Sequence, residues 1–134
     1  MSIEELAHTA DVRIRVKAPD LSELFVEAAR GMMQVMYGGC EEGTITEELA
    51  LEAGDHEELL HDFLSELLYL CDVRDVVFCS FLVRVENTRL SAILKGVPFD
   101  RKQHQGTEIK GVSYYGLQIV KEEESYATDI LFDV

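Results

Sequence analysis

The chain has 134 residues, of which 47% are hydrophobic and 28% charged, a balance typical of a globular domain rather than a disordered chain. Its 26 acidic and 12 basic side chains give a net charge of -14. Because nucleic-acid affinity depends on Lys and Arg neutralising phosphates, this surface excludes strong direct binding to nucleic acid. A basic protein or a hard cation matches this negative charge better than a nucleic acid does. We predict one domain over residues 1–134.

No apolar run approaches the roughly 20 residues needed to span a bilayer. The acidic N-terminus lacks the apolar stretch of a secretory signal, so we predict a cytoplasmic protein. Its three cysteines form no C-x-x-C pair, which argues against a disulfide framework or a zinc site. Cys71 and Cys79 lie in apolar segments and are expected to be buried thiols.

Residues 11–18 alternate between apolar and basic side chains, the period-two pattern of a half-buried strand. One face carries Val12, Ile14 and Val16, and the other carries Arg13, Arg15 and Lys17. A short partner strand is expected at residues 3–7. The strand 11–18 thus has one face for the core and one for solvent.

Two amphipathic helices follow from the spacing of apolar residues. The first is predicted over residues 21–37, with Asp20 as its N-cap. Residues 41–54 are acidic and are predicted to form a loop followed by a strand. The second helix is predicted over about 56–72, with Asp55 as its N-cap.

The last third of the chain favours strands. Residues 76–85 and 90–96 are predicted to form a hairpin, followed by a polar loop at 96–106 and strands at about 107–120 and 125–133. The resulting order, ββαβαββββ, predicts an α+β two-layer sandwich. In this fold, two helices pack on one mainly antiparallel mixed sheet.

Candidate catalytic motifs are sparse, since the P-loop, the dinucleotide fingerprint and the Gly-x-Ser-x-Gly elbow are all missing. The polar stretch His8-Thr9-Ala10-Asp11 leads into a strand, and Asp133 closes the last strand beside the terminal carboxylate of Val134. If these strand ends are neighbours, three carboxylates converge, as Ca²⁺ or Mg²⁺ requires. Alternatively, Asp11 caps local backbone and Asp133 is an exposed strand end.

An ordered set of stretches along nearly the whole chain carries a family resemblance: Glu5–Asp11, Asp20–Ala29, Leu59–Leu70, Gly96–His104, Ile109–Tyr114 and Leu131–Val134. On these residues the chain resembles the archease family, small accessory proteins of the RtcB-type RNA ligase. The resemblance implies an activator in tRNA splicing and RNA repair, and no enzyme of its own. Such an activator promotes guanylylation of the ligase's active-site histidine, supports multiple turnover and can broaden nucleotide use.

The resemblance also implies a metal site at Asp11, Asp133 and Val134, with Ca²⁺ as the expected ion and Mg²⁺ or Mn²⁺ as alternatives. It places the contacts with the ligase at a polar tip, where activation is tied to Lys110 and to the acidic pair. The expected residues of this activation site are His8, His104 and Lys110.

Two positions depart from the family pattern. Many members carry His where this chain has Tyr115, and Glu commonly stands at the position of Val97. Two other functions remain open. One is a metal-dependent hydrolase or phosphotransferase that uses His8, Asp11 and Asp133 directly, and the other is a chaperone-like module.

Overall fold

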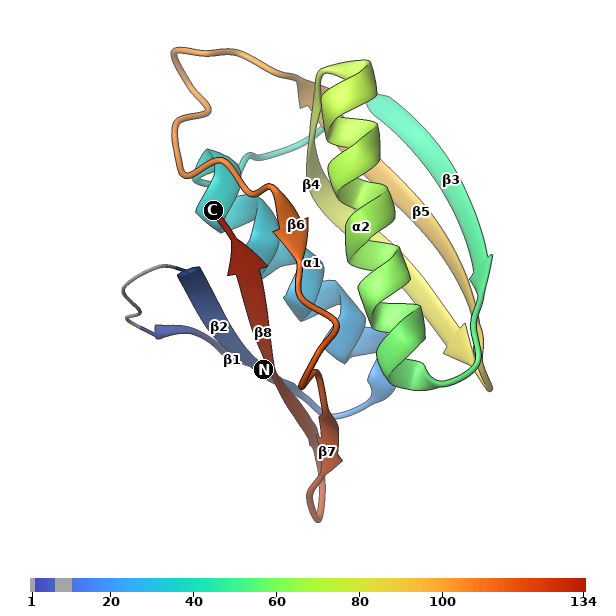
Figure 1. Ribbon diagram of the computed structural model, residues 1–134. Helices are drawn as coiled ribbons and strands as arrows, with labels where there is room; N and C mark the ends of the chain where they lie inside the picture. Colours follow the sequence, from blue (N-terminus) through green and yellow to red (C-terminus); the bar gives the residue numbers. More distant parts are fainter. Residues whose placement is uncertain (1, 7–10) are drawn as a thin grey trace.

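The computed structural model describes residues 2–6 and 11–134, and Figure 1 shows how its elements are arranged. In chain order the elements are β1 (Ser2–Leu6), β2 (Asp11–Ala18), α1 (Leu21–Tyr37), β3 (Ile45–Glu52), α2 (His56–Arg74), β4 (Val76–Glu86), β5 (Arg89–Pro98), β6 (Gly111–Val112), β7 (Ile119–Lys121) and β8 (Tyr126–Asp133).

Two antiparallel sheets and two helices make up the fold. The first sheet has the order β1-β2-β8-β6, with β7 also paired to β8, and the second has the order β3-β5-β4. Both helices contact both sheets: α1 packs on β2 and β4, while α2 packs on β6 and β4 (Figure 1). The predicted α+β class and element order are confirmed. The prediction of one mixed sheet is wrong, because there are two sheets and every described strand pair is antiparallel.

Because α1 is buried on most of its sides, a single sheet cannot cover it. Six consecutive residues, 24–29, are buried, including the charged Glu27, whose Oε1 accepts a hydrogen bond from Arg30 Nη1 at 3.1 Å. A helix that is apolar on nearly all sides needs cover on more than one side. The second sheet supplies it, and α2 joins the same core through Phe63, whose ring stacks on Phe25 with centroids 6.0 Å apart.

Gly31 lets α1 approach the first sheet closely. A Cβ at this position would lie 2.6 Å from Ile14 Cδ1 of β2 and 3.3 Å from Ile3 Cγ2 of β1. A larger side chain would therefore force Ile14 to move within the packed core. Ile14 is 1% exposed, so this contact lies at the centre of the core.

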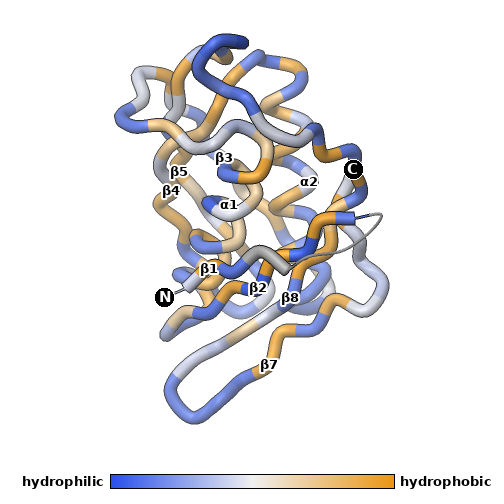
Figure 2. Tube along the Cα trace, turned by 90° about the vertical axis from the view of Figure 1, so that its left-hand side faces the viewer, coloured by the Kyte–Doolittle hydropathy of each residue, from blue (hydrophilic) through white to orange (hydrophobic). Residues whose placement is uncertain are grey.

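Strand β2 pairs antiparallel with β8, and the burial of its side chains confirms the predicted alternation between a core face and a solvent face. Ile14, Val16 and Ala18 are buried, whereas Arg15 and Lys17 are exposed. Figure 2 shows the same alternation of hydrophobic and hydrophilic residues along β2. The register runs from Asp11 opposite Asp133 to Ala18 opposite Tyr126.

Both helices begin where the capping residues predict. Asp20 Oδ1 accepts a hydrogen bond from the Glu23 N–H, and Asp55 Oδ1 accepts one from the Glu58 N–H, each at 2.8 Å. Such caps satisfy backbone donors that the first helical turn leaves unpaired. The first helix has the predicted bounds, and the second extends two residues past the predicted end at 72, to Arg74.

The predicted strand over residues 107–120 is reduced to two short strands, β6 and β7. A turn separates them, in which the Leu117 N–H donates to the Tyr114 carbonyl at 3.1 Å and Gly116 has a φ of 79°. A left-handed residue at this point ends the extended run, and glycine adopts it without steric cost. The residues are apolar enough for a strand, but the turn redirects the chain.

The cysteine prediction is wrong in one part. Cys40, in the loop after α1, and Cys79, in β4, form a disulfide across a sequence separation of 39. Cys79 stands at a β-bulge, where the register with β5 shifts between Phe78 and Ser80. The pairing was not predictable from spacing because only the packing of α1 against β4 brings the two residues together. Cys71 is a buried free thiol, as predicted.

Removing this disulfide is expected to lower stability. A cross-link over a loop of this length stabilises a domain by about 2–4 kcal/mol through the unfolded chain. We therefore expect the Cys40→Ser/Cys79→Ser variant to unfold at a clearly lower urea midpoint than the oxidised wild type. Wild type treated with a reductant should match the variant. Equal midpoints for oxidised wild type and variant would contradict a stabilising role.

Candidate functional site

Two carboxylates face each other at the end of the first sheet. Asp11 opens β2 and Asp133 closes β8, and the register pairs them directly. Residues opposite each other in antiparallel strands have Cα atoms about 4.5–5.5 Å apart and side chains on the same face. Both lie on the face opposite the buried Ile14 and Phe132, so they point away from the core.

Lys110 joins the same end of the sheet through β6. Its backbone N–H donates to the Asp133 carbonyl at 2.7 Å, and the next residue, Gly111, pairs with Asp133. Gly111 leaves the side of this carboxylate open, because a Cβ there would lie 3.7 Å from Asp133 Oδ2. The Lys110 side chain is exposed beside this opening.

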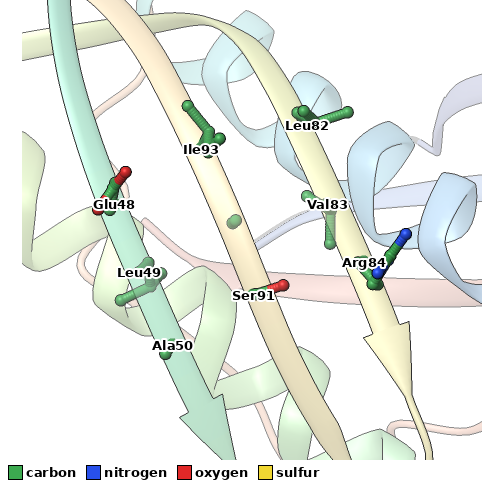
Figure 3. A pocket seen from close by; sticks show the side chains of 9 residues that line it. Glu48, Leu49, Ala50, Leu82, Val83, Arg84, Ser91 and Ile93 are labelled. Atoms are coloured by element: carbon green, nitrogen blue, oxygen red, sulfur yellow. The ribbon is translucent and has the colours of Figure 1, made fainter.

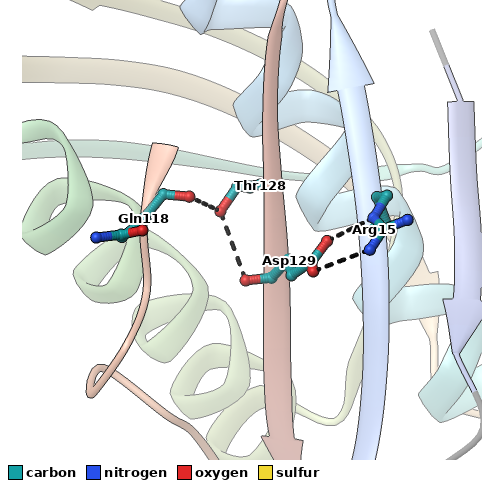
Figure 4. Close-up of polar contacts among 4 residues, drawn as sticks. All are labelled: Arg15, Gln118, Thr128 and Asp129. Carbon is teal, nitrogen blue, oxygen red and sulfur yellow. Dashed lines mark hydrogen bonds and ion pairs between the residues drawn. The ribbon is translucent and has the colours of Figure 1, made fainter. Parts of the chain in front are cut away.

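The outer face of the first sheet continues from this pair as rows of charged residues. Along β2 the same face carries Arg13, Arg15 and Lys17. Arg15 binds Asp129 of β8 through two contacts, Nε to Oδ1 at 2.8 Å and Nη2 to Oδ2 at 3.2 Å, as Figure 4 shows. Lys17 Nζ contacts Glu122 Oε2 at 3.1 Å.

The Arg15–Asp129 pair has an electrostatic consequence. Its hydrogen bonds to Arg15 lower the pKa of Asp129, against a smaller opposing effect of partial burial. Beneath this pair, Thr128 is 4% exposed and its Oγ1 donates to the Gln118 carbonyl at 2.7 Å (Figure 4). The face beside the carboxylate pair is thus held by side-chain bonds between β2, β8 and the segment before β7.

The residues at this end suit a hard cation in donor chemistry. Two carboxylates on one face, with a C-terminal carboxylate one residue further on, are oxygen donors of the kind that Ca²⁺ and Mg²⁺ bind. Among the side chains that the structure describes, those of residues 2–4 and 11–134, no group of three His, Cys, Asp or Glu is arranged to hold a metal ion. A complete site would therefore need the Val134 carboxylate or a residue outside these ranges.

The two predicted histidines differ in what the structure says of them. His8 lies outside the described residues. His104 is 6% exposed, and its Nδ1 accepts the Asp100 N–H at 2.9 Å. Its ring lies against Phe99 and Tyr37, with centroids 5.9 and 6.3 Å away. These contacts give His104 a role in fixing the loop after β5, rather than an exposed position beside Asp133.

The two positions that depart from the family pattern have different environments. Tyr115 is 96% exposed in the turn after β6. Val97 is half-buried opposite Val77 in the second sheet. Beside Tyr115, Tyr114 contacts the His61 ring at 5.4 Å, and nearby carboxylates, Asp55 foremost, raise the pKa of Tyr114.

The remaining polar groups with catalytic potential are occupied elsewhere. The His61 Nε2 lies 3.0 Å from the Val112 carbonyl, and the His56 Nε2 lies 2.7 Å from the Asn87 carbonyl. Burial raises the pKa of the Cys71 thiol to about 12, which leaves it protonated and unreactive at neutral pH. Among the described residues, these groups form no nucleophile–base pair at the carboxylate end.

One hollow lies away from the carboxylate pair. It has a volume of about 710 Å³ and lies over the strands of the second sheet. Figure 3 shows Glu48, Leu82, Arg84 and Ile93 lining it, from all three strands. It presents apolar side chains flanked by single charges and no convergent set of titratable groups.

Solved structures with the same architecture define the class of protein. The solution structure of protein 1598 from Methanobacterium thermoautotrophicum matches with a TM-score of 0.88 and 25% identity, covering 98% of both chains. A Thermotoga maritima crystal structure titled as an archease and possible chaperone matches with a TM-score of 0.69 and 22% identity, covering 96% of this chain and 94% of the other. The fold is that of these small α+β proteins.

Sequence comparison gives the family. The protein archease of Methanosarcina acetivorans is 35% identical, covering 98% of this chain and 94% of that protein. The archease-like protein of Drosophila melanogaster is 33% identical, and the match covers 100% of this chain and 91% of that protein. The model of the Archease protein family (MTH1598/TM1083) matches residues 3–134. This chain therefore belongs to the archease family.

Neither described helix has the length and apolar composition needed to cross a membrane.

The Arg15–Asp129 pair should leave a signature in the pH dependence of stability. Because the folded-state pKa of Asp129 is lowered, its contribution is present above the ordinary carboxyl pKa, about 3.9, and is lost as the pH falls through the folded value. We expect Asp129→Asn to be less stable than wild type at pH 7, with a difference that shrinks as the pH falls below the ordinary carboxyl pKa. Thermal midpoints over a series of pH values test this, and a difference that stays constant as the pH falls would contradict it.

Proposed function

We propose that this protein is the activator of an RtcB-type RNA ligase, acting in tRNA splicing and RNA repair in the cytoplasm. In this role it promotes guanylylation of the ligase's active-site histidine and supports multiple turnover. It also broadens the range of nucleoside triphosphates that the ligase uses. Membership of the archease family supports this proposal. The observation that carries it is the carboxylate pair of Asp11 and Asp133, with the backbone of Lys110 hydrogen-bonded to the Asp133 carbonyl beside it.

The arrangement of this end suits docking rather than independent catalysis. Asp11 and Asp133 lie where strands end, on the face turned away from the core, and Lys110 is exposed just before β6. Such a tip can enter another protein's active site without disturbing its own fold. The described histidines that a free-standing hydrolase would need as general bases are bonded to backbone groups. These features favour an accessory protein over an enzyme.

A divalent cation, Ca²⁺ foremost, is part of the proposal. Asp11, Asp133 and the terminal carboxylate of Val134 would hold it, and the bound ion would supply positive charge where the two aspartates otherwise repel phosphate. The peptide N–H of Lys110 orients the backbone of Asp133. Its exposed ammonium is a point charge that attracts a phosphate oxygen of the ligase-bound nucleotide.

The proposal is tested by mixing substoichiometric protein with the cognate ligase, GTP and Mn²⁺. Wild type should increase both guanylylated ligase and joined RNA. Lys110→Ala, which removes one charge, should reduce this stimulation by about tenfold or more, as for a charge-assisted contact worth about 1.5–3 kcal/mol.

Lys95→Ala is the matched control. Lys95 is exposed on the second sheet, so its variant should stimulate like wild type. No stimulation by wild type would sink the activator proposal. GTP turnover without ligase would favour an enzyme, and protection of unfolded proteins without ligase stimulation would favour a chaperone-like module.

Metal binding is tested separately by thermal unfolding. Binding to the folded state at 100 times the dissociation constant stabilises a protein by about 2.7 kcal/mol, so Ca²⁺ should raise the wild-type midpoint by several degrees. Asp133→Asn should remove the shift, because it removes a ligand. Asp129→Asn, on the same face and away from the pair, should keep it. Parallel titrations with Mg²⁺ and Mn²⁺ rank the ions, and an equal Ca²⁺ shift in Asp133→Asn would refute the ligand assignment.

A further inference from the structure

Arg13 differs from the other basic side chains on the outer face of the first sheet. Arg15 and Lys17, which follow it on β2, each bind a carboxylate of a neighbouring segment. Among the side chains that the structure describes, those of residues 2–4 and 11–134, Arg13 forms no ion pair. Its partner across the strand on β8 is Leu131, which offers no acceptor, and its charge acts on the more distant Asp129, whose pKa it helps to lower. The partly exposed guanidinium of Arg13 therefore has hydrogen-bond donors available, whereas Arg15 and Lys17 are already paired.

Its position is next to the carboxylate pair. Arg13 lies two residues from Asp11 on the same face of β2, a spacing of about 6.6 Å along a strand. This distance is within the reach of an arginine side chain. Lys110 approaches the pair from the other side, through β6. Two cationic side chains without described ion pairs thus flank the carboxylate pair.

The chemistry of this arrangement selects an anion with several oxygens. A chain of net charge -14 repels phosphate over most of its surface. Repulsion is weakest beside a partly exposed guanidinium, and arginine binds phosphate bidentately through its planar fork of donors. A cation shared by Asp11 and Asp133 would strengthen the same preference.

We propose that Arg13 binds a phosphate group of the nucleoside triphosphate that the ligase uses. This inference rests on the proposed function, and it assigns Arg13 to nucleotide binding. Arg13 and Lys110 would contact phosphate oxygens from opposite sides of the aspartate pair. In this assignment Arg15 has a different role, since its guanidinium is held by Asp129.

The test is stimulated guanylylation measured over a series of GTP concentrations. Arg13→Gln should raise the KM for GTP by about tenfold, the loss expected for one charge-assisted contact, with a smaller change in the maximal rate. Arg13→Lys should recover part of the loss, because it restores the charge and not the bidentate geometry. The matched control is Arg84→Gln. Arg84 is exposed on the second sheet and also lacks an ion pair with a described residue, so its variant should leave the KM unchanged.

Several results would overturn the inference while the proposed function stands. One is wild-type stimulation with an unchanged KM for GTP in Arg13→Gln. Another is a requirement for more activator, rather than more GTP, which would identify a carboxylate of the ligase as the partner of Arg13. A third is an equal loss in Arg84→Gln, which would indicate a general effect of charge. Failure of wild type to stimulate is the separate outcome that removes the proposed function itself. Unfolding midpoints near the wild-type value show that the variants are folded.

Discussion

The antiparallel ladder between β2 and β8 is the constraint on which the rest of the structure depends. It joins a strand near the start of the chain to the last strand, from Asp11 opposite Asp133 to Ala18 opposite Tyr126. Side chains alternate between the two faces with a period of two, so a slip of one residue would exchange the core face for the solvent face. The same register therefore sets the core, the charged outer face and the carboxylate pair.

The inner face of this ladder determines how the helices pack. Ile14 contacts α1 where Gly31 has no side chain, and the helix comes close enough to bury nearly all of its sides. The second sheet covers what the first cannot, and the Cys40–Cys79 disulfide ties the end of α1 to that sheet. The fold is thus a helix pair held between two sheets, and the carboxylate pair lies at the end of the first of them.

The outer face of the first sheet combines paired charges with a pair of neighbouring carboxylates at its end. Arg15 and Lys17 are neutralised by neighbouring carboxylates, which fixes β2, β8 and the turn before β8. At the end of this face, Asp11 and Asp133 are neighbours, and the basic residues Arg13 and Lys110 lie close to them in the fold. Like charges placed side by side destabilise a sheet unless a cation or partner compensates. Such an arrangement is typical of binding sites, and it supports a role for this end in meeting a ligase and its nucleotide.

Much of this could be predicted from the sequence because the signals are local. Alternation over 11–18, the caps Asp20 and Asp55 and the apolar helices predicted the α+β class and the element order. The strand over 107–120 was not predicted correctly, since a single turn around Gly116 overrides its apolar composition.

The sequence by itself determined which residues have an inner and an outer face, and it suggested that Asp11 and Asp133 belong together. Only the tertiary structure decided that the helices need two sheets, that Cys40 meets Cys79, and that Arg15 binds Asp129. These outcomes depend on strand register and on contacts between distant segments. Hydrophobic periodicity specifies the face of a residue, but it does not specify the partner that the residue meets across that face.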